Sequence, residues 1–435
     1  MKVLVVGGGG REHALIRALS RSPSEPELFC APGNAGIADD AEIVHVGGED
    51  VDGLLGVARE KGIDLVVVGP EAPLVAGLVD ALEDAGIAAF GPTGAGAQIE
   101  GSKLFAKNLM KEAGVPTAAH TVLRSKQEAL EQLACASYPT VLKADGLAAG
   151  KGVIIAPTEG EAREAADVFF TERRFGETRV VIEEFLEGEE LSLLALCDGE
   201  NVLPLAPAQD YKRIYDGDEG PNTGGMGSYS PVPGIDSAEA ERIVDLAHRP
   251  VVEAMRRRGI PYRGVLYAGL MLTESGPKVL EFNCRFGDPE TQAVLPRLRS
   301  DLIGICLATR TEGGLSGLEA KFADEWAVTV VLASAGYPES SSKGDVISGL
   351  DEAAAIDGVE ITHAGTARRD GEIVTAGGRV LNVTGLGATA ADARQRAYDA
   401  AELIGFDGKQ MRTDIAARAT SAADRPADPA RSAAD

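Results

Sequence analysis

Short apolar segments alternate with helical patterns through the first hundred residues, and this alternation constrains the fold more than any other feature. Residues 2–6 form a β-rich apolar run, which glycines and a helical pattern over residues 12–19 follow. Further strand candidates are residues 27–31, 64–69 and 88–90. Strands that alternate with helices predict a doubly wound parallel sheet. The ligand crevice of such a sheet lies at the carboxyl ends of its strands.

Glycine-rich loops occupy those strand ends, at residues 7–11, 32–36 and 69–72. The first loop does not match a dinucleotide-binding fingerprint, because its third glycine would fall on Glu12, and the second strand ends without an acid for a ribose. The loop can instead offer backbone N–H groups and Arg11 to a single phosphate at a helix N-terminus. A tight structural turn is the alternative.

Size and charge limit the class of protein. The 435 residues, of which 44% are hydrophobic, allow roughly two to four domains. A formal net charge of −25 argues against nucleic acid as a partner, because binding to a phosphate backbone requires a basic surface. No stretch reaches the roughly 18 apolar residues of a membrane span, and no signal-peptide pattern follows Met1. We therefore expect a cytoplasmic protein with no membrane partner.

The acidic residues are spread along the chain, and arginine outnumbers lysine among the basic residues. Together with abundant alanine and glycine, this resembles the composition of proteins adapted to high intracellular salt, where screening relieves self-repulsion. An acidic protein from ordinary conditions is the alternative. Equal stability and activity of the purified protein without added salt would contradict the halophilic hypothesis.

Shifts in pattern divide the chain into three domains and a tail. We expect an N-terminal domain over residues 1–101, a central mixed domain over 102–324 and a small C-terminal α+β domain over 325–416. Residues 417–435 consist of Ala, Asp, Arg, Ser and Pro without periodicity, which predicts a disordered tail.

The central domain begins with a helix expected over residues 103–113. Two strand pairs follow in the prediction. Residues 140–143 pair with 153–156, and residues 179–184 pair with 191–197.

A glycine-rich loop that starts at Lys143 and includes Gly146, Gly150, Lys151 and Gly152 joins the first of these strand pairs. Its composition is typical of a flexible lid that carries lysines toward phosphate oxygens. It is not a Walker A loop, because Gly152 occupies the position where Ser or Thr would bind magnesium. A structural hairpin is the alternative.

The run from residue 281 to 290 collects carboxylates, an amide and a guanidinium at the end of a strand expected over residues 277–282. Glu281 and Asn283 are two residues apart, so their oxygens project from the same face of the strand, where a hard cation could be bound together with nucleotide phosphates. Arg285 falls on that face as a fork for phosphate or carboxylate. A surface ion-pair cluster is the alternative.

Two further segments suit a nucleotide or an anion. Residues 181–186 form a strand that enters a turn and could face a flat base, with Glu189 or Glu190 available to a ribose. Residues 220–227 are unusually rich in glycine for a turn, and their amides could approach a phosphate or carboxylate closely. The neighbouring residues 210–213 add charge of both signs.

Six motifs, in order and over residues 1–415, resemble those of the phosphoribosylamine–glycine ligase family (GAR synthetases), which are ATP-grasp enzymes of purine biosynthesis. They are residues 9–14, 31–36, 69–74, the loop from Lys143 to Gly152, residues 221–227 and residues 281–290. The chain departs from the pattern at two places. ATP-grasp enzymes often carry a further metal carboxylate on the strand before Glu281, whereas Tyr267, Ala268 and Gly269 offer none here. The family often has His where this chain has Tyr211.

The resemblance implies an α/β fold with an N-terminal doubly wound parallel-sheet domain, a central ATP-grasp domain and a small C-terminal α+β domain. A mobile lid subdomain would span about residues 115–188. It also implies that glycine and ATP form glycyl phosphate and ADP, and that 5-phosphoribosylamine then attacks the acyl carbon to give glycinamide ribonucleotide. No covalent enzyme nucleophile is required.

The resemblance also implies roles for individual residues. Mg²⁺ or Mn²⁺, as one or two ions, would be bound by Glu281 and Asn283. ATP would be bound by Lys103, Lys143, Gly146, Gly150, Lys151, Gly152, Glu183, Glu184, Phe185, Leu186 and Glu190. The substrates would be bound by Gly9, Gly10, Arg11, Asn34, Glu71, Asp210, Lys212, Asn222, Thr223, Gly224, Gly225, Arg285 and Asp288. Lys143, Arg285 and Asp288 are the catalytic candidates, and whether Arg285 holds glycine or its phosphate is open.

Two other functions remain at this point. Another ATP-grasp ligase or carboxylase would keep the ATP residues and change the loops of the first domain. A nucleotide-binding regulatory protein with an inactive site would bind ATP without turnover. For the ligase we expect a monomer or a weak homodimer.

Overall fold

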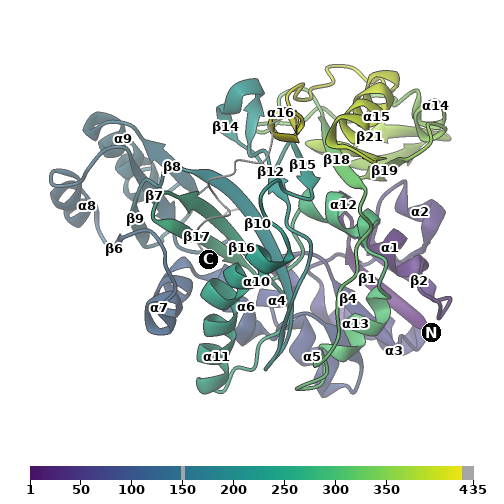
Figure 1. Cartoon of the computed structure of the whole chain (residues 1–435), viewed down its shortest axis with the longest axis horizontal. Coiled ribbons are helices and arrows are strands. Elements are labelled where there is room, and N and C mark those ends of the chain that lie inside the picture. The colour runs from purple at the N-terminus through teal and green to yellow at the C-terminus, as the bar shows by residue number, and fades with distance from the viewer. Residues whose placement is uncertain (148–151, 424–435) are drawn as a thin grey trace.

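The structure is a computed structural model and describes residues 1–147 and 152–423. The structure consists of an N-terminal domain, a C-terminal domain, a central sheet and a lid subdomain (Figure 1). The N-terminal and C-terminal domains lie side by side at one end, with the helices α8 (Lys126–Leu133) and α9 (Glu159–Phe170) at the other end. A central antiparallel sheet lies between them. None of the described helices is long and apolar enough to cross a membrane.

The N-terminal domain is a parallel sheet in the order β3-β2-β1-β4-β5, which confirms the predicted doubly wound sheet. Alternate residues of β1 enter two different cores, Val3 and Val5 on one face and Leu4 and Val6 on the other, because helices cover both faces of the sheet. The strands are β1 (Lys2–Gly7), β2 (Glu27–Pro32), β3 (Glu42–Ile43), β4 (Leu65–Val68) and β5 (Ala88–Phe90). The helices are α1 (Gly10–Ser20), α2 (Ile37–Asp40), α3 (Val51–Lys61), α4 (Glu71–Val75), α5 (Leu78–Asp84) and α6 (Gly94–Gly101).

The lid subdomain is an antiparallel sheet in the order β6-β9-β7-β8, packed against α8 and α9. Its strands are β6 (His120–Leu123), β7 (Thr140–Ala144), β8 (Val153–Ala156) and β9 (Val180–Glu184). The helix α7 (Lys103–Ala113) leads into it. The pairing of β7 with β8 confirms the first predicted strand pair.

The second predicted strand pair is wrong. β9 pairs with β6 and β7, whereas the next strand, β10 (Glu189–Asp198), belongs to the central sheet and pairs with β16 (Arg263–Thr273). The chain changes sheets at Gly188, where a Cβ would lie 2.2 Å from the carbonyl oxygen of Leu272. This close approach leaves room only for glycine and directs the chain along β16 instead of back along β9.

The central sheet has the order β11-β10-β16-β17, with β11 at Val202–Pro204 and β17 at Gly276–Asn283. A continuous helical segment covers one face, made of α10 (Ser237–Ile243), η2 (Val244–His248) and α11 (Arg249–Arg257). The chain after β17 forms α12 (Glu290–Val294), η3 (Leu295–Arg297) and α13 (Leu302–Ala308), which pack toward the N-terminal domain.

The C-terminal sheet, in the order β12-β15-β18-β22-β19, crosses the expected boundary at residue 324. Its strands β12 (Gln209–Asp210) and β15 (Gly227–Ser230) come from the central part of the chain, with β13 (Arg213–Tyr215), η1 (Asp216–Asp218) and β14 (Glu219–Asn222) between them. The remaining elements are β18 (Trp326–Ala333), α14 (Leu350–Ala354), β19 (Val359–His363), β20 (Thr366–Arg369), β21 (Glu372–Thr375), β22 (Arg379–Gly387) and α15 (Ala390–Leu403). The C-terminal domain therefore directly supports the glycine-rich segment at residues 220–227.

The first part of the predicted disordered tail is instead the helix α16 (Ala417–Ala423). Ala416 and Ala419 are buried in the C-terminal core, and the N–H of Ala416 donates to the hydroxyl of Tyr211 at 2.9 Å. Tertiary packing thus orders a segment whose sequence has no apolar periodicity. Residues 424–435 of the predicted tail lie outside the described residues.

Candidate active site

Glu281 and Asn283 end β17 and face the space that the lid subdomain borders. Their partners on β16 are Gly269 and Tyr267, so the neighbouring strand adds no carboxylate at this level. Among the described residues, neither side chain has a hydrogen-bond or ion-pair partner. Burial raises the pKa of Glu281, but the charges of the surrounding lysines outweigh burial and leave the pKa below its usual value.

An ionised carboxylate and an amide oxygen with no protein donor fit a hard divalent cation. The described residues contain no group of three or more Asp, Glu, His or Cys arranged to hold a metal by themselves. Phosphate and water oxygens would have to complete the coordination shell, as is usual for magnesium.

Lys143 reaches the same region from β7, where its Nζ donates to the carbonyl oxygen of Leu280 at 3.3 Å. It also forms an ion pair with Glu183 at 2.9 Å, and Lys107 of α7 approaches the other oxygen of Glu183 at 3.1 Å. Glu183 is only 2% exposed. The structure therefore places Glu183, a predicted adenosine residue, between Lys107 and Lys143.

Lys103 and the start of the glycine-rich loop are joined. The Nζ of Lys103 donates to the carbonyl oxygen of Gly146 at 3.1 Å, and the hydroxyl of Ser102 donates to Asp145 at 3.0 Å. At the other end of the loop, the N–H of Ala144 donates to the carbonyl oxygen of Gly152 at 2.9 Å. Gly150 and Lys151, both predicted ATP residues, lie outside the described residues.

The other predicted adenosine residues line the connection from β9 to β10. Phe185 is 36% exposed and Leu186 is buried. Glu184 forms an ion pair with Lys278 at 3.0 Å. Glu190 pairs with Lys212 of the adjoining loop, which joins the ATP side to the predicted substrate side.

Arg285 is held by two carboxylates of the N-terminal domain. It contacts Glu71 at 3.3 Å and Glu100 at 3.0 Å, and Glu100 also accepts the N–H of Cys284 at 2.7 Å. Burial raises the pKa of Glu71, but the charges of Arg285 and Arg11 outweigh burial and lower it. The guanidinium is thus fixed at the boundary between the β17 edge and the first domain.

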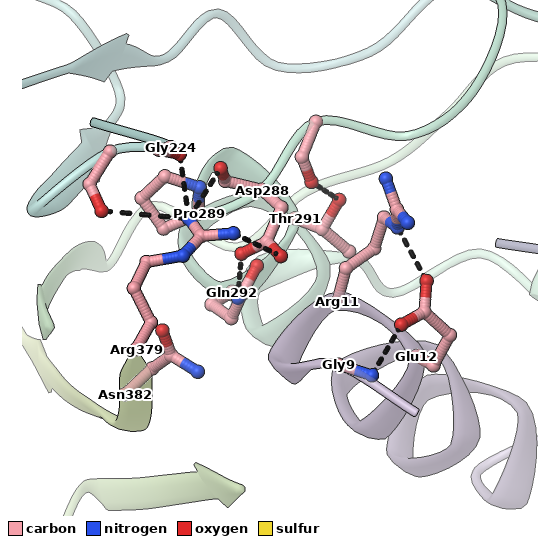
Figure 2. A network of polar contacts seen from close by, with 12 residues as sticks. Gly9, Arg11, Glu12, Gly224, Asp288, Pro289, Thr291, Gln292, Arg379 and Asn382 are labelled. Atoms are coloured by element: carbon pink, nitrogen blue, oxygen red, sulfur yellow. Dashed lines mark hydrogen bonds and ion pairs between the residues drawn. The ribbon is translucent and has the colours of Figure 1, made fainter. Parts of the chain in front are cut away.

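The first glycine loop packs against the same boundary. Arg11 forms an ion pair with Glu12 at 2.5 Å and donates to the carbonyl oxygen of Phe286 at 3.2 Å. The N–H of Gly9 donates to Glu12 at 2.6 Å, as Figure 2 shows. A Cβ at Gly10 would lie 2.0 Å from the side-chain nitrogen of Asn382, so only glycine allows α1 to approach the C-terminal domain here.

The side chain of Asn34, another predicted substrate residue, forms four hydrogen bonds within the protein. Its amide nitrogen donates to the carbonyl oxygens of Gly8 at 2.9 Å and His363 at 2.7 Å. Its oxygen accepts the N–H groups of Gly36 and Ile37. Asn34 therefore shapes the loop and joins the N-terminal and C-terminal domains.

The segment around Asp210 and Lys212 faces the β17 edge from the C-terminal sheet. Burial lowers the pKa of Lys212, but the charges of Asp210 and Glu190 outweigh burial and raise it well above its usual value, so the ammonium stays charged. Thr223 donates to the carbonyl oxygen of Lys212 at 2.9 Å and accepts the N–H of Gly225. The predicted substrate residues Asp210, Lys212, Asn222, Thr223, Gly224 and Gly225 thus form one connected loop system.

Asp288 lies where the candidate site meets the C-terminal domain. It forms an ion pair with Arg379 at 2.8 Å and accepts the side-chain N–H of Gln292 at 2.7 Å (Figure 2). Burial raises the pKa of Asp288, but the charges of Arg379 and Arg11 outweigh burial and lower it. The carboxylate is therefore ionised at neutral pH.

Comparison with known proteins identifies the family. Family models match three consecutive parts of the chain: the N domain of phosphoribosylglycinamide synthetase over residues 1–100, its ATP-grasp (A) domain over 101–291 and its C domain over 327–418. The chain belongs to the phosphoribosylglycinamide synthetase family. The resemblance seen in the motifs is thereby confirmed, together with the ATP-grasp fold of the central domain.

Relatives match over nearly the whole length. The phosphoribosylamine–glycine ligase of Streptomyces coelicolor is 53% identical over 425 residues, which cover 97% of this chain and 100% of the relative. The enzyme of the same name from Caldanaerobacter subterraneus is 50% identical and covers 96% and 100%. The crystal structure of the Thermotoga maritima ligase has a TM-score of 0.83 at 37% identity and covers 95% and 100%. The predicted ligase function in purine biosynthesis is confirmed.

A more distant structure shares only the fold. The biotin carboxylase domain of the Hydrogenobacter thermophilus 2-oxoglutarate carboxylase has a TM-score of 0.70 at 18% identity, and covers 98% of this chain and 99% of that domain.

Four residues that the sequence does not single out contact predicted site residues or lie beside them, namely Glu100, Lys107, Glu290 and Arg379. Glu290 was inside a recognised motif, and it accepts the hydroxyls of Ser192 at 2.9 Å and Tyr267 at 2.8 Å. Glu100 was noted only as a domain boundary. Lys107 and Arg379 carry no local signal, because each reaches its partner only through the tertiary fold.

Proposed function

We propose that the chain joins glycine to 5-phosphoribosylamine at the end of β17, by way of glycyl phosphate. A glycine carboxylate oxygen attacks the γ-phosphorus of ATP, and ADP leaves. The amine nitrogen of phosphoribosylamine then attacks the acyl carbon, inorganic phosphate leaves, and the amine loses a proton to solvent. The free oxygens of Glu281 and Asn283, surrounded by lysines, are the observation that supports this site most strongly.

Glu281 and Asn283 would hold Mg²⁺ or Mn²⁺, as one or two ions, and the bound metal would neutralise phosphate charge. Lys103 and Lys143 would orient the phosphates, because both ammonium groups approach the β17 edge. Phe185 and Leu186 would face the base. Catalysis in this scheme rests on positioning and charge neutralisation.

Asp288 and Arg285 are our candidates for the glycine end and the acyl phosphate. A buried ionised carboxylate suits the ammonium group of glycine, and a fixed guanidinium suits the phosphate. The loops at Gly9, Arg11 and Glu71 would receive phosphoribosylamine, because Glu71 contacts Arg285 and Arg11 contacts the neighbouring Phe286 at the boundary between the domains.

ADP formation tests this proposal, measured in a coupled assay with ATP, magnesium, glycine and freshly generated phosphoribosylamine. We expect ADP only when both substrates are present. ADP release with bicarbonate or another acid in place of glycine would favour a different ATP-grasp ligase or carboxylase. Tight ATP binding without turnover would favour a regulatory protein. Sedimentation of the purified chain tests the expected monomer or weak homodimer.

A further inference from the structure

We propose that Arg379, on the first residue of β22 in the C-terminal domain, is a positioning residue of the ligase site. In this role it holds Asp288 and the Gly224–Gly225 turn in the arrangement that receives glycine. The inference rests on the proposed function, because it assigns the ammonium group of glycine to Asp288. None of the six recognised motifs lies in residues 325–416, so this role would add the C-terminal domain to the site.

The guanidinium of Arg379 contacts two separate segments at once (Figure 2). Nη2 donates to the carboxylate of Asp288 at 2.8 Å, while Nη1 donates to the carbonyl oxygens of Asp288 at 2.9 Å and Gly224 at 2.6 Å. A planar fork can serve these acceptors together, whereas the point charge of a lysine cannot. Arg379 therefore fixes the distance between the Asp288 carboxylate and the Gly224 backbone.

The turn at Gly224 packs closely against Arg379 and Pro289. A Cβ at Gly224 would lie 3.0 Å from Cζ of Arg379, and a Cβ at Gly225 would lie 2.4 Å from Cδ of Pro289. The N–H of Gly224 donates to the hydroxyl of Tyr337, also of the C-terminal domain, at 3.0 Å. The two glycines permit a backbone contact that any side chain would obstruct.

The contacts continue from this turn to the lysine that faces the β17 edge. Thr223 bonds the N–H of Gly225 on one side and the carbonyl oxygen of Lys212 on the other. A shift of the Gly224 turn would therefore move Lys212 as well as Asp288. Arg379 acts on the substrates only through these groups.

The charge of Arg379 also serves Asp288 directly. Burial raises the pKa of Asp288, and Arg379 is the strongest of the cations that lower it. The other groups that face this carboxyl are Arg11, Gln292 and Arg285. Removal of Arg379 would weaken both the orientation and the ionisation of the carboxylate.

An ion pair that only docks the C-terminal domain is the competing interpretation. Arg412 provides a control for it, because it also lies in the C-terminal domain and its guanidinium also joins that domain to residues 213–218. It donates to Asp218 at 2.8 Å and to the carbonyl oxygen of Arg213 at 3.1 Å. None of its hydrogen bonds within the described residues reaches Asp288 or Gly224.

The test compares full-length Arg379→Met, Arg379→Lys and Arg412→Met variants by ADP formation at varied glycine and varied ATP. We expect Arg379→Met to raise the KM for glycine about tenfold, the usual effect of losing a charge-assisted hydrogen bond, while the KM for ATP changes less than about twofold. The glycine KM of Arg379→Lys should lie between those of Arg379→Met and the wild type. Arg412→Met should lower the thermal midpoint without separating the two KM values.

An unchanged glycine KM in Arg379→Met, or an equal rise in both KM values, would overturn the inference. If Arg379→Met does not fold, Arg379→Lys decides by the same ratio of KM values. The proposed function fails separately, if the wild type forms no ADP from glycine and phosphoribosylamine.

Discussion

At the candidate site, charged neighbours that do not contact Glu281 keep its carboxylate ionised. Glu281 has no ion-pair partner among the described residues, yet Lys212, Lys143 and Lys103 lower its pKa against the effect of burial. Arg285 and Asp288, in contrast, have direct partners. Glu281 is therefore free to bind a cation, whereas Arg285 and Asp288 are oriented by their partners before any substrate binds.

Glu281→Ala should abolish magnesium-dependent turnover, with a loss of kcat of about 100-fold or more, because the proposed metal loses its charged ligand. The far-UV circular dichroism should stay unchanged. Glu274→Ala, in the exposed turn between β16 and β17, is the control and should retain activity. Wild-type turnover in Glu281→Ala would rule out this metal site.

Arg11→Ala should raise the KM for phosphoribosylamine about tenfold, because an arginine contact to a phosphate is lost. The KM for ATP should not change. Arg17→Ala removes another arginine of α1, which pairs with Asp40 at 3.0 Å, and should leave all KM values as they are. An unaltered requirement for phosphoribosylamine in Arg11→Ala would argue against a substrate site in the first domain.

At the scale of elements, one buried cluster joins α7 to the lid sheet. Lys107 on α7 and Lys143 on β7 share the two oxygens of Glu183 on β9, and Lys107 donates to Thr117 at 2.8 Å. Burial lowers the pKa of Lys107, while the charge of Glu183 opposes this effect. The position of Lys143 beside β17 therefore depends on an element outside the lid.

Lys107→Met should lower the free energy of unfolding by about 1–3 kcal/mol, because it leaves one oxygen of a buried carboxylate without its cation. It should also raise the KM for ATP several-fold, since Lys143 loses part of its support. Lys126→Met is the control, because it removes an exposed ion pair with Asp167 in the same subdomain. Denaturant unfolding and steady-state kinetics measure both effects, and an ATP KM equal to that of the control would contradict the coupling.

At the scale of the whole molecule, two histidines connect the first and last domains. The N–H of His363 donates to Nδ1 of His13 at 2.9 Å, and Nε2 of His13 contacts Asp40 at 2.8 Å. Burial lowers the pKa of His363 to about 3, and the charges of His13 and Arg17 act in the same direction. The imidazole of His363 at this interface therefore stays neutral at pH values well below the ordinary pKa of histidine.

The free energy of unfolding should fall as the pH is lowered, because the folded chain opposes protonation of the His363 imidazole. The unfolded chain protonates His363 near pH 6.5, whereas the folded chain does so near pH 3. Its contribution is complete above pH 6.5 and should decrease by about 1.4 kcal/mol per pH unit between these values. Denaturant midpoints from pH 7 to 5 should fall less steeply in His363→Gln than in the wild type. The exposed His45 provides the control variant, His45→Gln, and an equal slope in both variants would contradict this assignment.

Most strands and helices, and the chemistry of the motifs, could be predicted from local sequence patterns. Apolar runs and glycines predicted the parallel sheet, and the spacing of Glu281, Asn283 and Arg285 predicted their common place at a strand end, because side-chain alternation and turn formation are local properties. The same motifs were sufficient for the family. The salt requirement, the metal and the individual substrate contacts stay predictions.

The tertiary structure decided which distant groups meet. It placed β9 and β10 in different sheets, joined Ala416, just before α16, to Tyr211, and placed Glu183 between two lysines. Arg379 reaches Asp288 across 91 positions of the chain. Such contacts depend on how separate domains pack, and no local periodicity records them.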